Sequence, residues 1–274
     1  MKPVRFDYLK ANDAQHVLQL LRQHGDEAKC IAGGQSLGPM LNLRLARPKV
    51  LVDLHSASDL QEIEHRADEI IYGSATRHAQ FEDHLVPDAS QGLLRTAAGA
   101  IGYRAIRNRG TIGGSIAHAD PAADWIGIMV GLNATYHLQS HKRKRLVQAQ
   151  DFMSAAFMTE LAADEIITAV SVPKLSTSAR WGYYKYSRKA TGYSESTGIV
   201  VADPERGYCR VLLGALDVPP VALEDVANAL AEQGVKAAMA AVPAEIERLL
   251  EGYSAVKKQL FKVVIERALA QVGG

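Results

Sequence analysis

Two short glycine-glycine loops are the segments of this sequence best suited to chemistry. The first is Ala32-Gly33-Gly34-Gln35-Ser36 and the second is Thr111-Ile112-Gly113-Gly114-Ser115. Glycine has no Cβ and tolerates positive φ, so successive backbone amides can point at one anion. Ser36, Thr111 and Ser115 add hydroxyl groups, and a helix that follows the first loop offers its N-terminus. The two loops therefore predict contacts with phosphate.

Neither loop identifies its ligand alone, because a glycine pair is more often only a turn. Neither fits the Gly-x-Gly-x-x-Gly fingerprint of dinucleotide-binding folds, and neither has the Gly-Lys-Ser/Thr end of a nucleotide-triphosphate loop. The loops thus indicate a phosphate group without indicating which molecule carries it.

The surroundings of the second loop add polar groups. Arg107-Asn108-Arg109-Gly110 precedes it, and Asp120 and Asp124 follow it. A helix is expected over 121–130, with Asp120 as its cap, Pro121 in its first position and Gly131 at its end. Asp124 then lies one turn into the helix, where its carboxylate could accept from ribose hydroxyls or compensate the helix dipole. Both roles stay open on these residues.

The composition is that of a globular protein. The chain has 274 residues, 47% hydrophobic and 22% charged, with a net charge of +1. The charge gives no general attraction to nucleic acid or membranes, and the basic run at 141–145 is expected to be a solvated turn. Because no stretch approaches the roughly 20 apolar residues of a membrane span, and no signal peptide is evident, we expect a cytoplasmic protein.

The cysteine count excludes several kinds of site. The chain has two cysteines, Cys30 and Cys209. An iron–sulfur cluster takes four thiolates, so this chain cannot hold one on cysteine alone. No Cys-x-x-Cys pair indicates structural zinc, and we expect neither a disulfide nor a metal ligand.

The first 55 residues predict a small unit of helices packed on strands. A helix is expected over 13–24, with Asn12 as its cap and Gly25 at its end. Strands are expected over 29–32 and 50–54, and a helix over 36–45.

The remaining chain predicts two further sections. Over residues 56–175, short strands alternate with turns, with strands expected at 69–72, 134–138, 145–149 and 165–172 and helices at 88–106 and 121–130. After a linker at 175–178 come strands at about 181–188, 195–203 and 208–216, then helices at about 222–233, 243–251 and 255–271. Strands at uneven spacing with few helices between them predict an α+β fold.

The order of the motifs resembles one family over nearly the whole chain. Both glycine loops and Asp120-Pro121-x-x-Asp124 are similar to the FAD-binding medium subunit of the molybdenum hydroxylases, a family that includes the flavoprotein subunit of aerobic carbon monoxide dehydrogenase and the flavin domain of xanthine dehydrogenase. Further matching segments are Phe6-Asp7-Tyr8, Val52-Asp53-Leu54, Gly73-Ser74-Ala75-Thr76, Asp164-Glu165-Ile166-Ile167, Lys185-Tyr186-Ser187-Arg188-Lys189 and Ile265-Glu266-Arg267-Ala268.

The resemblance implies a PCMH-type FAD-binding domain over residues 1–175, with subdomains at about 1–55 and 56–175. A smaller C-terminal domain over 176–274, with an antiparallel sheet and a helical bundle, follows it. The chain would carry non-covalent FAD. A large partner subunit would hold the molybdenum cofactor and choose the substrate, and a small partner would hold [2Fe–2S] clusters. Electrons would pass from those clusters through FAD to an external acceptor, in a heterohexamer that is a dimer of heterotrimers.

The resemblance also implies which residues contact FAD. Both loops hold the pyrophosphate, Asp124 binds the ribose or adenosine part, Tyr193 covers one face of the isoalloxazine ring, and Thr76 and His78 approach the flavin. The full set is Ile31, Ala32, Gly33, Gly34, Gln35, Ser36, Leu37, Thr76, His78, Ile101, Thr111, Ile112, Gly113, Gly114, Ser115, Asp120, Asp124, Leu161, Lys185 and Tyr193. No residue is expected to be catalytic, because the redox chemistry belongs to the cofactor.

Taken singly, several of these residues have ordinary structural roles. Ile101 and Leu161 are equally typical of a core, Lys185 of a solvated strand position, and His78 of a hydrogen-bonded structural histidine. Only the resemblance favours their functional roles.

Three positions depart from the family pattern. Gln35 stands where the family often has His, Ser115 where it usually has Asn, and Gly192 where it commonly has Asp. They leave open a nucleotide-binding module of the same fold without redox function. A stand-alone flavin oxidase also stays open, although no residue stands out as a covalent flavin link.

Overall fold

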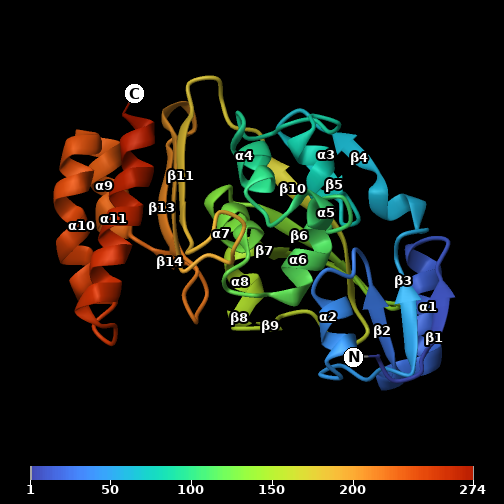
Figure 1. The fold of residues 1–274 in the computed structure, drawn as a ribbon. Coiled ribbons are helices and arrows are strands. Elements are labelled where there is room, and N and C mark those ends of the chain that lie inside the picture. Colours follow the sequence, from blue (N-terminus) through green and yellow to red (C-terminus); the bar gives the residue numbers. More distant parts are fainter. Residues whose placement is uncertain (1, 274) are drawn as a thin grey trace.

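The computed structural model describes residues 2–273 and contains three main sheets that follow one another along the chain (Figure 1). The N-terminal sheet lies at one end of the molecule, a five-stranded sheet lies in the middle, and a four-stranded sheet with three helices lies at the other end. Parallel and antiparallel sheets with helices segregated beside them confirm the α+β fold.

The N-terminal unit is a parallel three-stranded sheet with two helices. Its strands are β1 (Asp7–Lys10), β2 (Ala28–Ile31) and β3 (Val50–Asp53), in the order β1-β3-β2. Helix α1 (Ala14–His24) packs Val17, Leu18 and Leu21 into the core beside β3, and α2 (Leu37–Asn42) follows the first glycine loop. The expected strands and helices are confirmed, although α2 is shorter than predicted.

The start of α1 differs from the prediction by one residue. Asp13, not Asn12, is the N-cap: its backbone is extended (φ −155°) and its side chain accepts from the His16 amide at 2.7 Å. Gly25 ends the helix with a φ of +50°, as predicted.

The middle sheet is antiparallel throughout. Its order is β4-β5-β10-β6-β7, from strands β4 (Ile63–His65), β5 (Glu69–Gly73), β10 (Ile166–Pro173), β6 (Thr135–Gln139) and β7 (Lys144–Gln148). Around it lie six helices and one hairpin: α3 (His78–Glu82), α4 (Leu93–Gly99), α5 (Arg104–Arg107), α6 (Ile112–His118), α7 (Asp124–Gly131), α8 (Ala149–Phe152), β8 (Met153–Ala155) and β9 (Met158–Thr159).

Both helices predicted for the middle section were wrong in extent. The helix expected over 88–106 is two helices, α4 and α5, because Gly102 adopts a φ of +47° and breaks the helical path. The helix expected over 121–130 begins only at Asp124. The Asp120 side chain accepts from the Ala122 amide at 2.9 Å, which closes a separate turn rather than capping the helix.

The C-terminal section is an antiparallel sheet covered by three helices. Strands β11 (Arg180–Tyr186), β12 (Ser196–Asp203), β13 (Tyr208–Gly214) and β14 (Val221–Ala222) pair in that order. They are followed by α9 (Glu224–Gln233), α10 (Val235–Leu249) and α11 (Ala255–Val272). Helix α10 begins eight residues before the predicted start at 243, because the buried stripe Ala238, Val242 and Ile246 carries the helix through Pro243.

The core runs across the expected domain boundary at residue 175. One apolar cluster joins the middle section to Ile199, Val201 and Leu212 on the inner face of the C-terminal sheet, where α7 packs. A second cluster lies between the outer face and α9–α11 (Figure 1). The division of the chain into domains stays a prediction, but the packing makes the two sections one continuous body.

No helix within residues 2–273 is long and apolar enough to cross a membrane.

The closest approach between α11 and the sheet is at Gly182. A Cβ on this residue would lie 1.9 Å from the carbonyl oxygen of Ala268, so only glycine fits there. We expect Gly182→Ala to lower the free energy of unfolding by about 3 kcal/mol, the upper end of the cost of overpacking. Urea denaturation measures this change. Gly252→Ala is the control, because a Cβ on Gly252 meets nothing within 4 Å; equal midpoints for the two variants would contradict the prediction.

Candidate functional site

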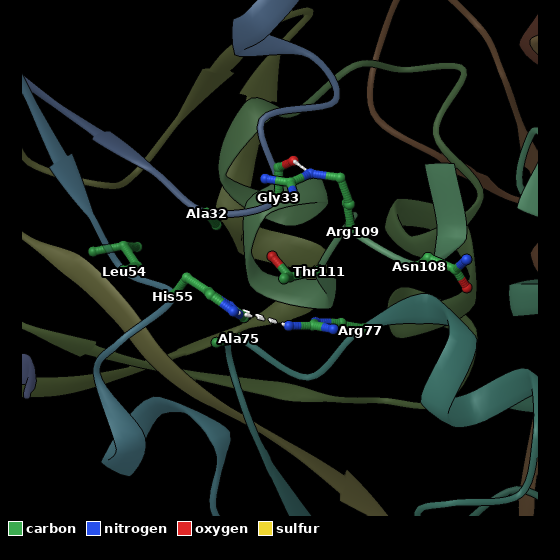
Figure 2. A pocket seen from close by; sticks show the side chains of 9 residues that line it. All are labelled: Ala32, Gly33, Leu54, His55, Ala75, Arg77, Asn108, Arg109 and Thr111. Carbon is green, nitrogen blue, oxygen red and sulfur yellow. Dashed lines mark hydrogen bonds between the residues drawn. The ribbon is translucent and has the colours of Figure 1, made fainter. Parts of the chain in front are cut away.

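The fold brings the two glycine loops into direct contact. The first loop joins β2 to α2, and the second begins where the chain leaves Arg109 and enters α6. A Cβ on Gly33 would lie 2.1 Å from the carbonyl oxygen of Arg109, and the Arg109 Nε donates to the Gly33 carbonyl at 3.4 Å (Figure 2). A Cβ on Gly114 would lie 3.5 Å from Ala32. The loops therefore form one structural feature, although they are far apart in sequence.

The second loop does not offer the free amides that its sequence predicts. Thr111 caps α6, and its hydroxyl accepts from the Gly114 amide at 3.1 Å. The amides of Ile112 and Gly113 donate at 2.9 Å to the carbonyls of Thr76 and Ser74. Ile112 and Gly113 are also buried, so both are part of the scaffold. The amides of Gly113 and Gly114 thus have internal acceptors in the structure, and the contact of these two residues with an anion stays a prediction.

The first loop has the donors that the second loop lacks. Within residues 2–273, the amides of Gly33, Gly34, Gln35 and Ser36 donate no hydrogen bond to a protein acceptor. All four residues are partly exposed, and Gly34 has a φ of +70°. The Gln35 side chain donates to the Gly33 carbonyl at 3.0 Å, which holds the loop's shape. A short segment with several unpaired amides is a place where an anion can bind.

A buried charge cluster links the second loop's surroundings to the C-terminal sheet. Asp124, the first residue of α7, is 8% exposed. It accepts from the Tyr183 hydroxyl, and the Lys185 Nζ lies 3.0 Å from its carboxylate. The same ammonium group donates to the Ala100 carbonyl at 3.2 Å. Burial raises the pKa of Asp124 above its ordinary value, and the Lys185 charge opposes that shift. Both carboxylate oxygens thus have partners, and a ribose contact from Asp124 stays a prediction.

Thr76 and His78 are buried beside the second loop. The Thr76 hydroxyl donates to the Gly73 carbonyl at 2.7 Å. His78 accepts on Nδ1 from the Trp125 indole at 3.0 Å, and burial lowers the pKa of its imidazole to about 3. Because the His78 amide donates to the Gly110 carbonyl, this segment fixes the start of the second loop. The observed contacts of both side chains are structural.

Ile101, Leu161 and Tyr193 differ in their exposure to solvent. Ile101 and Leu161 are partly buried and pack on the central core. Tyr193 is 69% exposed, on the segment between β11 and β12. Partial burial, and to a smaller extent the charge of Asp120, raise the pKa of Tyr193 above its ordinary value. Their contacts with a cofactor stay predictions.

Sequence analysis did not single out Tyr183, Arg77 or His55, and it named Arg109 only as a neighbour of the second loop. Tyr183 lies two residues before Lys185 on β11, and the alternation of side chains along a strand could have placed both on one face. Arg77, Arg109 and His55 line a pocket beside the loops (Figure 2). Nothing in the sequence indicates that these three residues meet.

Comparison with known proteins adds an independent line of evidence. A family model described as the FAD binding domain in molybdopterin dehydrogenase matches residues 4–175. The alpha subunit of the 6-hydroxypseudooxynicotine dehydrogenase complex of Paenarthrobacter nicotinovorans is 33% identical over 283 residues, covering 99% of this chain and 95% of the relative. The carbon monoxide dehydrogenase medium chain of Hydrogenophaga pseudoflava is 31% identical, covering 98% of this chain and 97% of the relative.

The fold is also similar to a solved structure. Carbon monoxide dehydrogenase from Hydrogenophaga pseudoflava, in a form that lacks the Mo-pyranopterin moiety of the molybdenum cofactor, matches with a TM-score of 0.89 and 29% identity. The match covers 99% of this chain and 98% of that chain, so it includes the C-terminal sheet and helices.

The buried ion pair of Asp124 and Lys185 leads to a prediction about stability. Lys185→Met leaves the Asp124 charge buried without its partner, and we expect it to cost about 3–5 kcal/mol. Adding Asp124→Asn removes the uncompensated charge, so the double variant should recover part of that loss. Urea denaturation of both single variants and the double variant measures the coupling.

Lys144→Met, at an exposed strand position of β7, is the matched control, and its free energy of unfolding should be close to that of the wild type. A double variant no more stable than Lys185→Met would contradict the proposed coupling.

The low pKa of His78 generates a pH prediction. The unfolded chain protonates this histidine near pH 6.5, whereas the folded protein does so only near pH 3. The stabilising effect of neutral His78 is therefore complete above pH 6.5 and decreases as the pH falls, by about 1.4 kcal/mol per unit.

His78→Asn keeps an acceptor for Trp125 without the titrating ring. Urea denaturation between pH 6.5 and 5.5 should show a smaller loss of stability in this variant than in the wild type. Equal slopes would mean that His78 titrates normally in the folded protein.

Proposed function

The chain belongs to the family of FAD-binding domains in molybdopterin dehydrogenases, and on that basis we propose that it is the electron-transfer subunit that binds FAD in its complex. It is an oxidoreductase subunit of a molybdenum-dependent dehydrogenase, similar to the medium chains of carbon monoxide dehydrogenase-type complexes.

The single observation that supports FAD binding most is the set of unpaired amides in the first loop. Gly33, Gly34, Gln35 and Ser36 present backbone donors on a loop that a second glycine loop holds in place. A diphosphate carries several acceptor oxygens and fits such a donor set. The residues present therefore fit the cofactor that the family implies.

We assign the other predicted residues to positions around the first loop. The first loop, from Ile31 to Leu37, holds the diphosphate, and Thr111 to Ser115 support it from the side. Asp124 and Lys185 anchor the ribose and flavin end as a preformed pair, with Thr76, His78 and Asp120 shaping the wall. Ile101 and Leu161 pack on the ring systems of FAD, and Tyr193 covers one face of the isoalloxazine ring. When bound, FAD supplies the two-electron chemistry that connects iron–sulfur carriers to an external acceptor.

We infer that the metal centres belong to partner subunits. A large partner holds the molybdenum cofactor, a small partner holds the [2Fe–2S] clusters, and two such heterotrimers associate. In this chain, burial raises the pKa of the Cys30 thiol to about 12 and of the Cys209 thiol to about 11. A thiol that stays protonated is a poor metal ligand and a poor nucleophile, which supports metal centres elsewhere and a non-covalent flavin.

The optical spectrum of the purified chain tests the proposal. We expect a flavin spectrum, release of unmodified FAD on acid denaturation, and bleaching by dithionite followed by recovery in air. A chain that takes up no FAD would count against the whole proposal. Bound FAD that cannot be reduced would favour the nucleotide-binding module, and a flavin that stays attached after denaturation would favour the covalent oxidase class.

The conformation of Gly34 generates a prediction about affinity. Its φ of +70° is one that an L side chain adopts with strain, and a Cβ there would lie 3.3 Å from Ile31. We expect Gly34→Ala to reorient the loop amides and weaken FAD binding about tenfold, equivalent to losing roughly one hydrogen bond to a charged group.

Gly25→Ala is the matched control, since Gly25 also has a positive φ, +50°, but lies away from the loops. Flavin fluorescence titration of the two variants measures the difference. Equal affinities would show that the loop's conformation is irrelevant to the cofactor.

A further inference from the structure

The short segment that connects α4 to α5 has its carbonyl groups held by two largely buried cations. The Ala100 carbonyl accepts from the Lys185 Nζ at 3.2 Å. The carbonyls of the next two residues, Ile101 and Gly102, both accept from the Arg107 Nη1, at 3.2 and 2.8 Å. Three consecutive carbonyls therefore have charged donors, although they belong to neither a helix nor a strand.

Arg107 itself is fixed on its other edge by Glu82. Its Nε and Nη2 donate to the two carboxylate oxygens at 2.7 and 2.8 Å, the paired geometry that a guanidinium and a carboxylate favour. Glu82 is the last residue of α3, which contacts both α4 and α5 (Figure 1). The preceding Phe81 is buried against the rings of Tyr72 and Trp125. Arg107 thus connects the segment to the aromatic core of the middle section.

The hydrogen bonds of Arg107 also fix where the amides of the segment point. In a planar trans peptide unit the carbonyl and the N–H point in opposite directions, and residues 2–273 contain no cis peptide bond. The Ile101 carbonyl shares its unit with the Gly102 amide, and the Gly102 carbonyl shares its unit with the Tyr103 amide. Both amides therefore point away from Arg107. Within the described part of the chain, neither amide donates to a protein acceptor.

These free amides lie beside residues that we propose to contact FAD. Lys185, whose ammonium group binds the Ala100 carbonyl, also lies 3.0 Å from the Asp124 carboxylate. Ile101, within the segment, belongs to the proposed set as well. A backbone amide without a protein acceptor is available to a ligand, and FAD carries acceptor atoms along its whole length. The segment therefore has both the donors and the position to contact the cofactor.

We propose that Arg107 is a positioning residue for FAD: from the side away from the cofactor, it holds the segment 100–103 so that Ile101 and the two free amides face FAD. The inference rests on the proposed function, because the acceptor is a group of FAD. All three guanidinium nitrogens already donate to Glu82 or to the two carbonyls. Arg107 therefore acts through the segment and not by contact with the cofactor.

The FAD affinity of Arg107→Met measures this role. Flavin fluorescence titration of the full chain should give a dissociation constant about tenfold above that of the wild type, because the segment loses the hydrogen bonds that orient its donors. Arg104→Met is the matched control. Arg104 binds the same Glu82 carboxylate, at 2.8 Å, but no carbonyl of the segment, so this variant should bind FAD as the wild type does.

Arg107→Lys is the conservative variant. A lysine keeps the charge but lacks the planar fork that binds a carboxylate on one edge and carbonyls on the other. It should therefore recover only part of the affinity that Arg107→Met loses.

Hydrogen exchange gives a second readout, which needs no FAD. The amides of Ala100 and Ile101 donate to carbonyls of α4, so they are protected only while the segment keeps its conformation. In the FAD-free chain, exchange at these two amides should be faster in Arg107→Met than in the wild type and unchanged in Arg104→Met.

The proposal is overturned if Arg107→Met binds FAD as tightly as the wild type, or if Arg104→Met weakens FAD binding as much. Weaker FAD binding without faster exchange would also overturn it, because Arg107 would then not act through the segment. If circular dichroism shows that Arg107→Met does not fold, Arg107→Lys compared with Arg104→Lys decides in the same way. A wild-type chain that takes up no FAD would remove the proposed function together with this inference, whereas failure of the Arg107 comparison alone would leave the proposed function intact.

Discussion

The contact between the α-carbon of Gly33 and the carbonyl oxygen of Arg109 is the constraint on which the candidate site depends. It joins the N-terminal sheet to the middle section at the point where both glycine loops begin. A side chain at this position would push the two loops apart by the width of a methyl group. The glycine here thus serves close packing of backbone on backbone rather than flexibility. The site depends on this close approach between two segments that are far apart in sequence.

With the loops in contact, their roles differ. The second loop uses its amides internally, in hydrogen bonds to Thr76, Ser74 and Thr111, and so becomes a rigid support. The first loop keeps its amides free and is the part that can bind. Two segments that look alike in sequence therefore differ in the fold, because the amides of the second loop have internal acceptors and those of the first loop do not.

The buried cluster of Asp124, Tyr183 and Lys185 extends this support to the C-terminal sheet. Burying a carboxylate and an ammonium costs free energy that their attraction only partly offsets, so such a pair is weak evidence for stability alone. Its geometry has a clearer role: Lys185 also binds the Ala100 carbonyl beside Ile101. The continuous core and the close packing of α11 at Gly182 hold β11 in place, and β11 carries two of the three residues.

The sequence by itself determined the α+β class, most strands and helices, and the family, because these follow from apolar periodicity and from motifs in a fixed order. The helix boundaries expected from the sequence were wrong at two places. A break at Gly102 separates α4 from α5, and α10 continues through Pro243. The sequence also could not decide which loop amides are free, that Tyr183 meets Asp124, or that Arg77 and Arg109 share one pocket. Those features depend on contacts between residues distant in sequence, and only the tertiary structure brings their atoms within hydrogen-bonding distance.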